Sequence, residues 1–228
     1  MLYYDSTYIV VLFGFLLAMA AQGLVSGSFN KWSDVISSTG LTGRETARRI
    51  LDAGGMHDVP VEHISGSMTD NYDPENNVLY LSDTVYNENT VAAIGVAAHE
   101  CGHALQDKEA YFPLRLRSNL VPLANIGSQA AVPLFFAGLV LSFEPLQKIG
   151  IYCFLFAVLF YLVTLPVEFN ASRRAVAILS DGILPDDELS GVKRVLMAAA
   201  MTYVASALQS MLQLVRLILL SGSRRRRD

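Results

Sequence analysis

The stretch Val96-Ala97-Ala98-His99-Glu100-Cys101-Gly102-His103-Ala104-Leu105 decides the fold and the chemistry expected of this chain. Its apolar residues predict a helix, and residues four positions apart lie on one face of a helix. The two imidazoles can therefore bind one metal ion, and the glutamate between them can reach a water bound to that ion. This is the His-Glu-x-x-His pattern of zinc hydrolases, although two histidines can also take this spacing by coincidence.

The composition indicates a membrane protein rather than a soluble domain. The chain has 228 residues, of which 52% are hydrophobic, and these are concentrated in blocks. The net charge of −4 argues against a nucleic-acid partner. The two cysteines, Cys101 and Cys153, predict no disulfide framework. Cys101 would point away from the face that the histidines share, so we expect it to pack and not to bind metal.

The chain divides into five segments. Residues 1–27 are expected to form a first transmembrane helix and a Ser-Gly-Ser linker, uncleaved because the leader lacks Lys and Arg. Residues 28–117 form the catalytic region, and residues 118–166 form a transmembrane hairpin with a short joint at 143–148. Residues 167–194 form a second catalytic segment. Residues 195–228 form an amphipathic or transmembrane helix with a basic tail.

The catalytic region predicts a small α+β fold. Thr42 to Glu45 fits a capping box that opens a helix through about residue 53. Residues 59–64 and 78–82 predict strands, and residues 70–77 predict a turn. Asn87 to Asn89 can cap the motif helix, which we expect over residues 90–106. The predicted fold class is therefore α+β, with a zincin-type metalloprotease core integrated with three or four membrane helices.

Two of the membrane segments carry polar positions at helical spacing. In the hairpin these are Pro122, Asn125, Gln129 and Pro133, which are expected to face protein and not lipid. In the last helix they form a stripe of Thr202, Ser206, Gln209, Gln213 and Arg216. That helix either spans the membrane with its stripe against the other helices or lies along the membrane surface.

A catalytic zinc site needs a third protein ligand. His57 and His63 are far upstream and are expected to be surface or packing residues. Glu168 follows the third apolar block, and the short hairpin returns it to the side of the membrane that holds His99. The spacing leaves two interpretations open: Glu168 is a ligand, or it is an ordinary acid beside the membrane, paired with a nearby arginine.

Further segments surround the motif and this acid. They are Met68-Thr69-Asp70, Tyr72-Asp73-Pro74, Val78 to Ser82, Val85-Tyr86, Val91 to Glu100, Pro166 to Ala175, and Ala200 to Ala205. With these segments the chain resembles the YugP-like neutral zinc metallopeptidases of bacterial membranes over nearly its whole length. The resemblance implies a gluzincin site in which His99, His103 and Glu168 hold one Zn²⁺. Related membrane gluzincins carry Asp at the position of Ser172, so another acid, such as Asp181, would have to orient a zinc-bound imidazole.

The expected function is zinc-dependent endopeptidase activity near the membrane surface. Glu100 would be the general base, and Tyr80, Arg173 and Arg174 are candidates for binding substrate and stabilising the oxyanion. The strand at 78–82 would offer its edge to an extended peptide. The alternatives are a catalytically silent zinc-binding membrane scaffold and a zinc amidase that acts on a non-protein substrate.

The expected location is the bacterial inner membrane, crossed several times. Basic residues gather on the side of the active site, which favours a cytoplasmic site; they are Lys31, Arg44, Arg115, Arg117, Arg173, Arg174, Lys193 and Arg194. Arg224 to Arg227 conflict with this orientation if the last helix crosses. Expected partners are a peptide or membrane-protein substrate and the lipid bilayer. Other membrane proteins or further copies of the chain are additional candidate partners.

Overall fold

The computed structural model describes residues 7–224, so the leader and most of the basic tail, Arg225 to Arg227, lie outside the described residues. The chain forms two compact units. The first, here called the helical unit, comprises Met1–Gln22, Arg115–Leu165 and Thr202–Asp228. The second, here called the site unit, comprises Gly23–Leu114 and Pro166–Met201.

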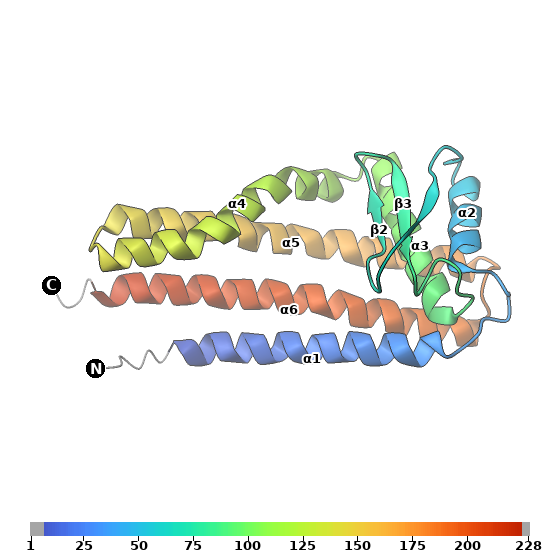
Figure 1. Ribbon diagram of the computed structural model, residues 1–228, viewed down its shortest axis with the longest axis horizontal. Helices are drawn as coiled ribbons and strands as arrows, with labels where there is room; N and C mark the ends of the chain where they lie inside the picture. The colour runs from blue at the N-terminus through green and yellow to red at the C-terminus, as the bar shows by residue number, and fades with distance from the viewer. Residues whose placement is uncertain (1–6, 225–228) are drawn as a thin grey trace. The chain divides into compact units, whose positions relative to one another are not determined.

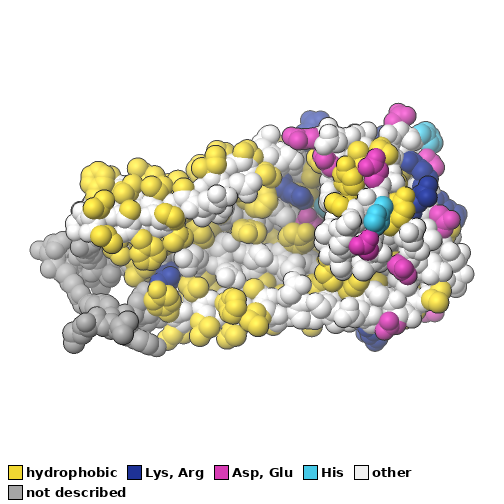
Figure 2. All heavy atoms as spheres, in the orientation of Figure 1, with side chains coloured by type: hydrophobic (Ala, Val, Ile, Leu, Met, Phe, Trp, Pro, Cys, Tyr) yellow, Lys and Arg dark blue, Asp and Glu magenta, His cyan; other side chains and the backbone are white. Residues whose placement is uncertain are grey.

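Four long helices supply the helical unit and also continue into the site unit. They are α1 (Tyr8–Ser33), α4 (Phe112–Val140), α5 (Glu144–Ser180) and α6 (Asp186–Arg224). All four are long and apolar enough to cross a membrane, as the apolar blocks predict. On the face drawn in Figure 2, hydrophobic side chains gather over the helical unit, whereas acidic side chains gather over the site unit. These features fit a membrane protein.

The ends of these helices differ from the prediction. Ser26-Gly27-Ser28, expected as a linker, lies inside α1. Helix α5 begins at Glu144, within the expected joint, and there Glu144 forms an ion pair with Lys148 at 2.8 Å. A carboxylate in the first turn of a helix is favoured by the helix dipole, which explains the early start. Helix α5 then continues past Pro166 to Ser180, and this continuation carries Glu168 into the site unit.

The predicted buried face of α4 is wrong. Pro122, Asn125, Gln129 and Pro133 are exposed. The face packed against α5 carries small residues instead, and a Cβ added at Gly127 would collide with the carbonyl oxygen of Cys153. Close approach of two helix backbones, made possible by small residues, outweighs the polar pattern here. Figure 1 shows the resulting α4–α5 hairpin.

The polar stripe of α6 faces the interior of the helical unit. Ser206, Gln209, Gln213 and Arg216 line a cavity of about 520 Å³ together with residues of α1, α4 and α5. Arg216 is buried; its Nε donates to Oγ1 of Thr7 at 3.2 Å, and its guanidinium lies over the Tyr8 ring. This arrangement favours the expectation that the stripe packs against other helices over the surface-lying alternative.

The site unit contains a three-stranded mixed sheet with the order β1-β3-β2 (Figure 1). Strands β1 (Val61–Ile64) and β3 (Val78–Ser82) are parallel and confirm two predicted strands. Strand β2 (Asn71–Asp73) pairs antiparallel with β3 and lies in the stretch predicted as a turn. Strand β3 is therefore central, and the expectation that it offers a free edge is wrong because both of its edges are paired.

Two helices complete the site unit. Helix α2 (Gly43–Ala53) begins with the predicted capping box between Thr42 and Glu45. Helix α3 (Val91–Lys108) carries the histidine motif. Its N-cap is Thr90, whose Oγ1 accepts from the N–H of Ala93, and not the predicted Asn87 to Asn89. Small buried residues of α3 pack against α2, the sheet and the ends of α5 and α6, which gives a mostly helical α+β arrangement.

Candidate metal centre

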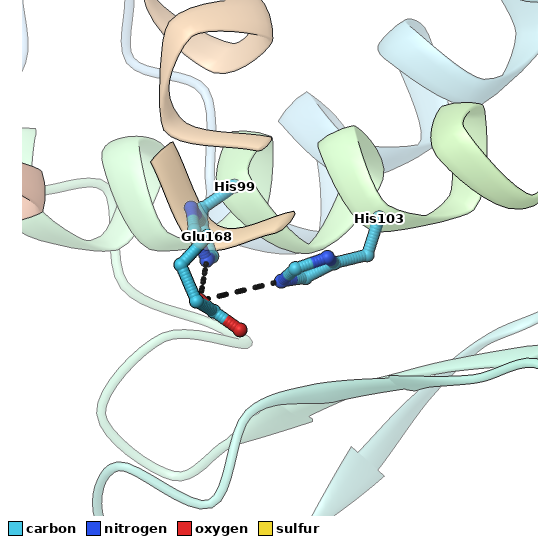
Figure 3. Close-up of side chains that lie close together, drawn as sticks. All are labelled: His99, His103 and Glu168. Atoms are coloured by element: carbon cyan, nitrogen blue, oxygen red, sulfur yellow. Dashed lines mark hydrogen bonds and ion pairs between the residues drawn. The ribbon is translucent and has the colours of Figure 1, made fainter. Parts of the chain in front are cut away.

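Three side chains converge between α3 and α5. His99 and His103 lie one turn apart on α3, and Glu168 lies on α5 (Figure 3). Oε2 of Glu168 is 3.3 Å from Nε2 of His99 and 3.6 Å from Nε2 of His103. One atom from each of the three residues lies within 4.8 Å of the others. The i, i+4 spacing of the histidines therefore places both rings on one face, opposite the glutamate.

Close contact between the two helices makes this convergence possible. Gly102 lies between the histidines in sequence, and a Cβ added there would be 2.7 Å from the carbonyl oxygen of Ala171. Ala171 is itself fully buried. With these two small residues at the crossing, α3 and α5 approach closely enough for side chains of ordinary length to meet.

The donor set fits a divalent metal ion of the zinc type. Two imidazole nitrogens and one carboxylate oxygen are the protein ligands found in one class of catalytic zinc sites, which leave a further position open. Glu168 is only 3% exposed, so its carboxylate is almost completely removed from water. A buried carboxylate requires a cationic or hydrogen-bonding partner, and the two imidazoles and an ion between them would provide one.

Glu100 lies beside this cluster on α3 and is also buried. Its Oε2 accepts a hydrogen bond from the main-chain N–H of Tyr72 in β2, at 3.0 Å. Burial raises the pKa of the Glu100 carboxyl to about 7. The Tyr72 contact was not predicted, because it depends on a strand that was predicted to be a turn.

Asp70 holds the start of β2 in place. Its two carboxylate oxygens accept from the N–H of Ser82, at 2.7 Å, and from the hydroxyl of Ser82, at 2.9 Å. Burial raises the pKa of Asp70 despite these hydrogen bonds. Ser82 is fully buried at the end of β3, so the Asp70 contact ties β2 to the central strand next to Glu100.

Among the described residues, no carboxylate forms a hydrogen bond with Nδ1 of His99 or of His103. Nδ1 of His99 is 3.2 Å from the hydroxyl of Ser172, and Nδ1 of His103 is 3.0 Å from Oε1 of Gln106. Asp181, the acid considered for this role, lies in the exposed turn after α5. Gln106 was missed from the sequence, although its position three residues after His103 places both on one helical face.

The predicted substrate-binding residues lie in three different settings. Tyr80 is partly buried in the central strand, opposite Asn71. Arg173 is exposed on α5. Arg174 donates from Nη1 and Nη2 to Glu109, at 2.8 and 2.6 Å, and not to Glu168. Their roles toward substrate stay predictions.

The two remaining histidines lie away from the cluster. His57 contacts Asp52 at 3.0 Å, and His63 contacts Asp83 at 2.6 Å. Both histidines are exposed. They are surface residues, as predicted.

Comparison with known proteins identifies the family of the chain. A family model described as "Putative neutral zinc metallopeptidase" matches residues 7–222. A curated relative, the "Putative membrane protease YugP" of Bacillus subtilis (strain 168), is 49% identical over 205 residues, which are 90% of this chain and 91% of the relative. No solved structure matches the chain. The resemblance noted in the sequence is therefore confirmed, and the chain belongs to the neutral zinc metallopeptidase family.

Proposed function

We propose that the chain is a membrane-embedded, zinc-dependent endopeptidase of the gluzincin type. One Zn²⁺ would be held by His99, His103 and Glu168. The observation that carries the proposal is the meeting of three suitable donor atoms within 4.8 Å, from two helices, beside a buried glutamate. The family assignment and the name of the relative support peptide hydrolysis.

The bound zinc and Glu100 would have separate roles in catalysis. Zinc, when bound, lowers the pKa of a coordinated water and polarises the scissile carbonyl. Glu100 accepts a proton from the attacking water and passes it to the leaving nitrogen as the carbon–nitrogen bond breaks. The Tyr72 N–H fixes one carboxylate oxygen, which limits the positions that Glu100 can take during the proton transfers.

The substrate would bind along β2 rather than along β3. Strand β2 is at one edge of the sheet, and its residue Tyr72 contacts Glu100 directly. An extended peptide can add to such an edge through main-chain hydrogen bonds, which recognise peptides without requiring one particular sequence. Arg173, exposed on the helix that carries Glu168, remains our candidate for stabilising the oxyanion; Tyr80 and Arg174 are candidates for further contacts with substrate.

The membrane setting suggests substrates that are themselves in the membrane. We propose the bacterial inner membrane and a cytoplasmic active site, because many basic residues flank the catalytic segments. The start of α1 and the end of α6 are in contact through Thr7, Tyr8 and Arg216. If both helices cross, the two termini lie on the same, external side. The arginine tail would then be an exception to the enrichment of Lys and Arg on the cytoplasmic side.

Cleavage of a peptide library by purified protein tests the proposed function. Wild type should bind about one zinc ion and cleave, whereas Glu100→Gln should keep the zinc and lose cleavage by about 10²–10⁴-fold. Glu62→Gln, the same change at an exposed glutamate on β1, is the matched control and should cleave like wild type. Zinc binding without cleavage of any peptide would contradict the proposal and support a catalytically silent scaffold. Hydrolysis of non-protein amides alone would contradict it and support an amidase.

Two further measurements test the membrane setting. A membrane-anchored reporter peptide should be cleaved faster than its soluble twin, and equal rates would contradict the preference for membrane substrates. Topology reporters fused at the N-terminus and after Asp228 should both report the external side. A cytoplasmic signal from the C-terminal fusion would mean that α6 does not cross.

A further inference from the structure

We propose that Gln106 is a positioning residue that fixes the tautomer and orientation of His103 for metal binding. This inference rests on the proposed zinc site. It assigns a role to Gln106, which does not bind the metal itself but acts through His103. Gln106 is fully buried on α3, and all of its polar atoms have partners in the site unit. A buried amide with this many partners is held in one orientation.

The contacts determine which end of the Gln106 amide is oxygen. One end lies 2.9 Å from the main-chain carbonyl oxygen of Val167. A carbonyl oxygen can only accept, so this end must be the NH₂ group. The same nitrogen also donates to Oδ1 of Asn170, at 2.9 Å. The other end, facing Nδ1 of His103 at 3.0 Å, is therefore the oxygen Oε1.

This orientation fixes the state of the imidazole. An amide oxygen can only accept, so Nδ1 of His103 must carry the hydrogen. In neutral imidazole the other nitrogen is then free of hydrogen, which leaves the lone pair of Nε2 available for a metal. Nε2 is the atom that lies 3.6 Å from Oε2 of Glu168. Gln106 thus selects the one neutral tautomer in which His103 can bind metal from that nitrogen.

A second layer of contacts holds Gln106 itself. Oδ1 of Asn170 accepts from Gln106 and also from Nε of Arg174, at 2.8 Å. Arg174 in turn forms a two-pronged ion pair with Glu109, just beyond the end of α3. An arginine can only donate, so Asn170 must present its oxygen, and the donors named in this series each meet an acceptor. The series joins α3 to α5 next to the metal ligands.

His99 lacks an equivalent constraint. Its Nδ1 is 3.2 Å from the hydroxyl of Ser172, and a hydroxyl can either donate or accept. The Ser172 contact is therefore compatible with both neutral tautomers of His99. Of the two contacts, only that of Gln106 selects a tautomer, and this difference makes Gln106 the sharper target for a test.

The experiment measures zinc affinity by competition with a chelator for wild type, Gln106→Met and Gln106→Glu. Methionine has a similar length but cannot accept from Nδ1, so zinc affinity should fall about 10–100-fold. Glutamate keeps an oxygen that accepts from Nδ1, but its second oxygen must carry a proton to donate where the Gln106 NH₂ group donates to Val167 and Asn170. Its zinc affinity should therefore lie between those of wild type and Gln106→Met. Cys101→Ala is the control for lost packing, because Cys101 is buried on α3 and contacts the Ala47 carbonyl instead of the site.

The outcomes separate a positioning role from a structural one. Zinc affinity of Gln106→Met within twofold of wild type, with a lower melting temperature like that of Cys101→Ala, would overturn the proposal. Nitrogen NMR of the metal-free wild type is a second test, and it does not require any variant to fold. It should show hydrogen on Nδ1 of His103, and hydrogen on Nε2 of the neutral ring would also overturn it. Failure of the wild type to bind zinc refutes the proposed function, while the NMR result still tests the tautomer.

Discussion

The main-chain N–H of Tyr72 donates to Oε2 of Glu100, and the atoms are 3.0 Å apart. This hydrogen bond joins an edge strand of the sheet to the proposed general base. Asp70, two residues before Tyr72, anchors the same strand to Ser82 of β3. The position of Glu100 therefore depends on the position of β2. A substitution of Asp70 should thus lower catalytic activity without displacing the metal ligands.

Asp70→Ala should lower kcat/KM for peptide cleavage by about tenfold or more, because small displacements of a catalytic group are costly. The zinc content should stay at the wild-type value, since Asp70 contacts none of the proposed ligands. Asp73→Ala is the control: this carboxylate bonds only within its own turn, to Glu75 and Asn76. Loss of zinc in Asp70→Ala would contradict a role confined to the base and strand.

Glu168→Ala should abolish retention of zinc at a chelator concentration that leaves wild type loaded, because it removes one of three proposed protein ligands. Elemental analysis after dialysis measures the zinc. Glu144→Ala is the control, since Glu144 is an exposed glutamate at the start of the same helix. Full zinc occupancy in Glu168→Ala would remove Glu168 from the ligand set and, with it, the gluzincin assignment.

Local patterns predicted the parts of the molecule that depend on neighbours in sequence. The capping box at Thr42, the motif helix and the strand at Val78–Ser82 all follow from residues a few positions apart. The pairing of His99 with His103 on one face follows from the helical repeat. Glu168 needed a resemblance as well as its place after an apolar block, because 69 residues separate it from His99.

The parts that were missed depend on contacts between distant segments. Strand β2 has only three residues and is defined by its pairing with β3, which no local pattern reveals. For the same reason, the central place of β3 could not be inferred without the sheet order. The hydrogen bonds of Gln106 to Val167 and Asn170 span more than 60 residues, so only its proximity to His103 was visible beforehand.

Gly102→Ala should destabilise the site unit by about 1–3 kcal/mol and weaken zinc binding. The new Cβ would lie 2.7 Å from the Ala171 carbonyl oxygen and 3.1 Å from its Cα, and backbone atoms cannot move aside alone. Helices α3 and α5 would have to separate at the point where the ligands meet. Gly27→Ala, in helix α1 with nothing near the added Cβ, should leave zinc affinity unchanged and should not lower stability, because alanine is a better helix former than glycine. Thermal melts and chelator competition measure the two effects, and wild-type zinc affinity in Gly102→Ala would show that the ligands tolerate this separation.

Acid should remove the stabilising effect of Glu109. Its hydrogen bonds to Arg174 hold the pKa of the Glu109 carboxyl below the usual 4.5. A lowered pKa stabilises the fold at pH values above 4.5, and this contribution is lost as the pH falls through the lowered value. Metal-free Glu109→Gln should therefore melt about 1–3 °C below wild type at pH 7, and the difference should vanish in acid. A difference that persists in acid would assign the effect to packing and not to charge.

Ser172 offers a way to strengthen the contact at His99. Ser172→Asp would place a carboxylate near Nδ1, now 3.2 Å from the hydroxyl, and a carboxylate can only accept. It should fix hydrogen on Nδ1 and make Nε2 more basic, which raises zinc affinity several-fold, whereas Ser172→Ala should lower it by up to about tenfold. Ser180→Ala is the control, because it removes an exposed hydroxyl at the end of the same helix that contacts only the Ala177 carbonyl oxygen. Equal zinc affinity in all three variants would mean that the Ser172 hydroxyl does not orient His99, and that Gln106 at His103 is the main constraint on ring orientation.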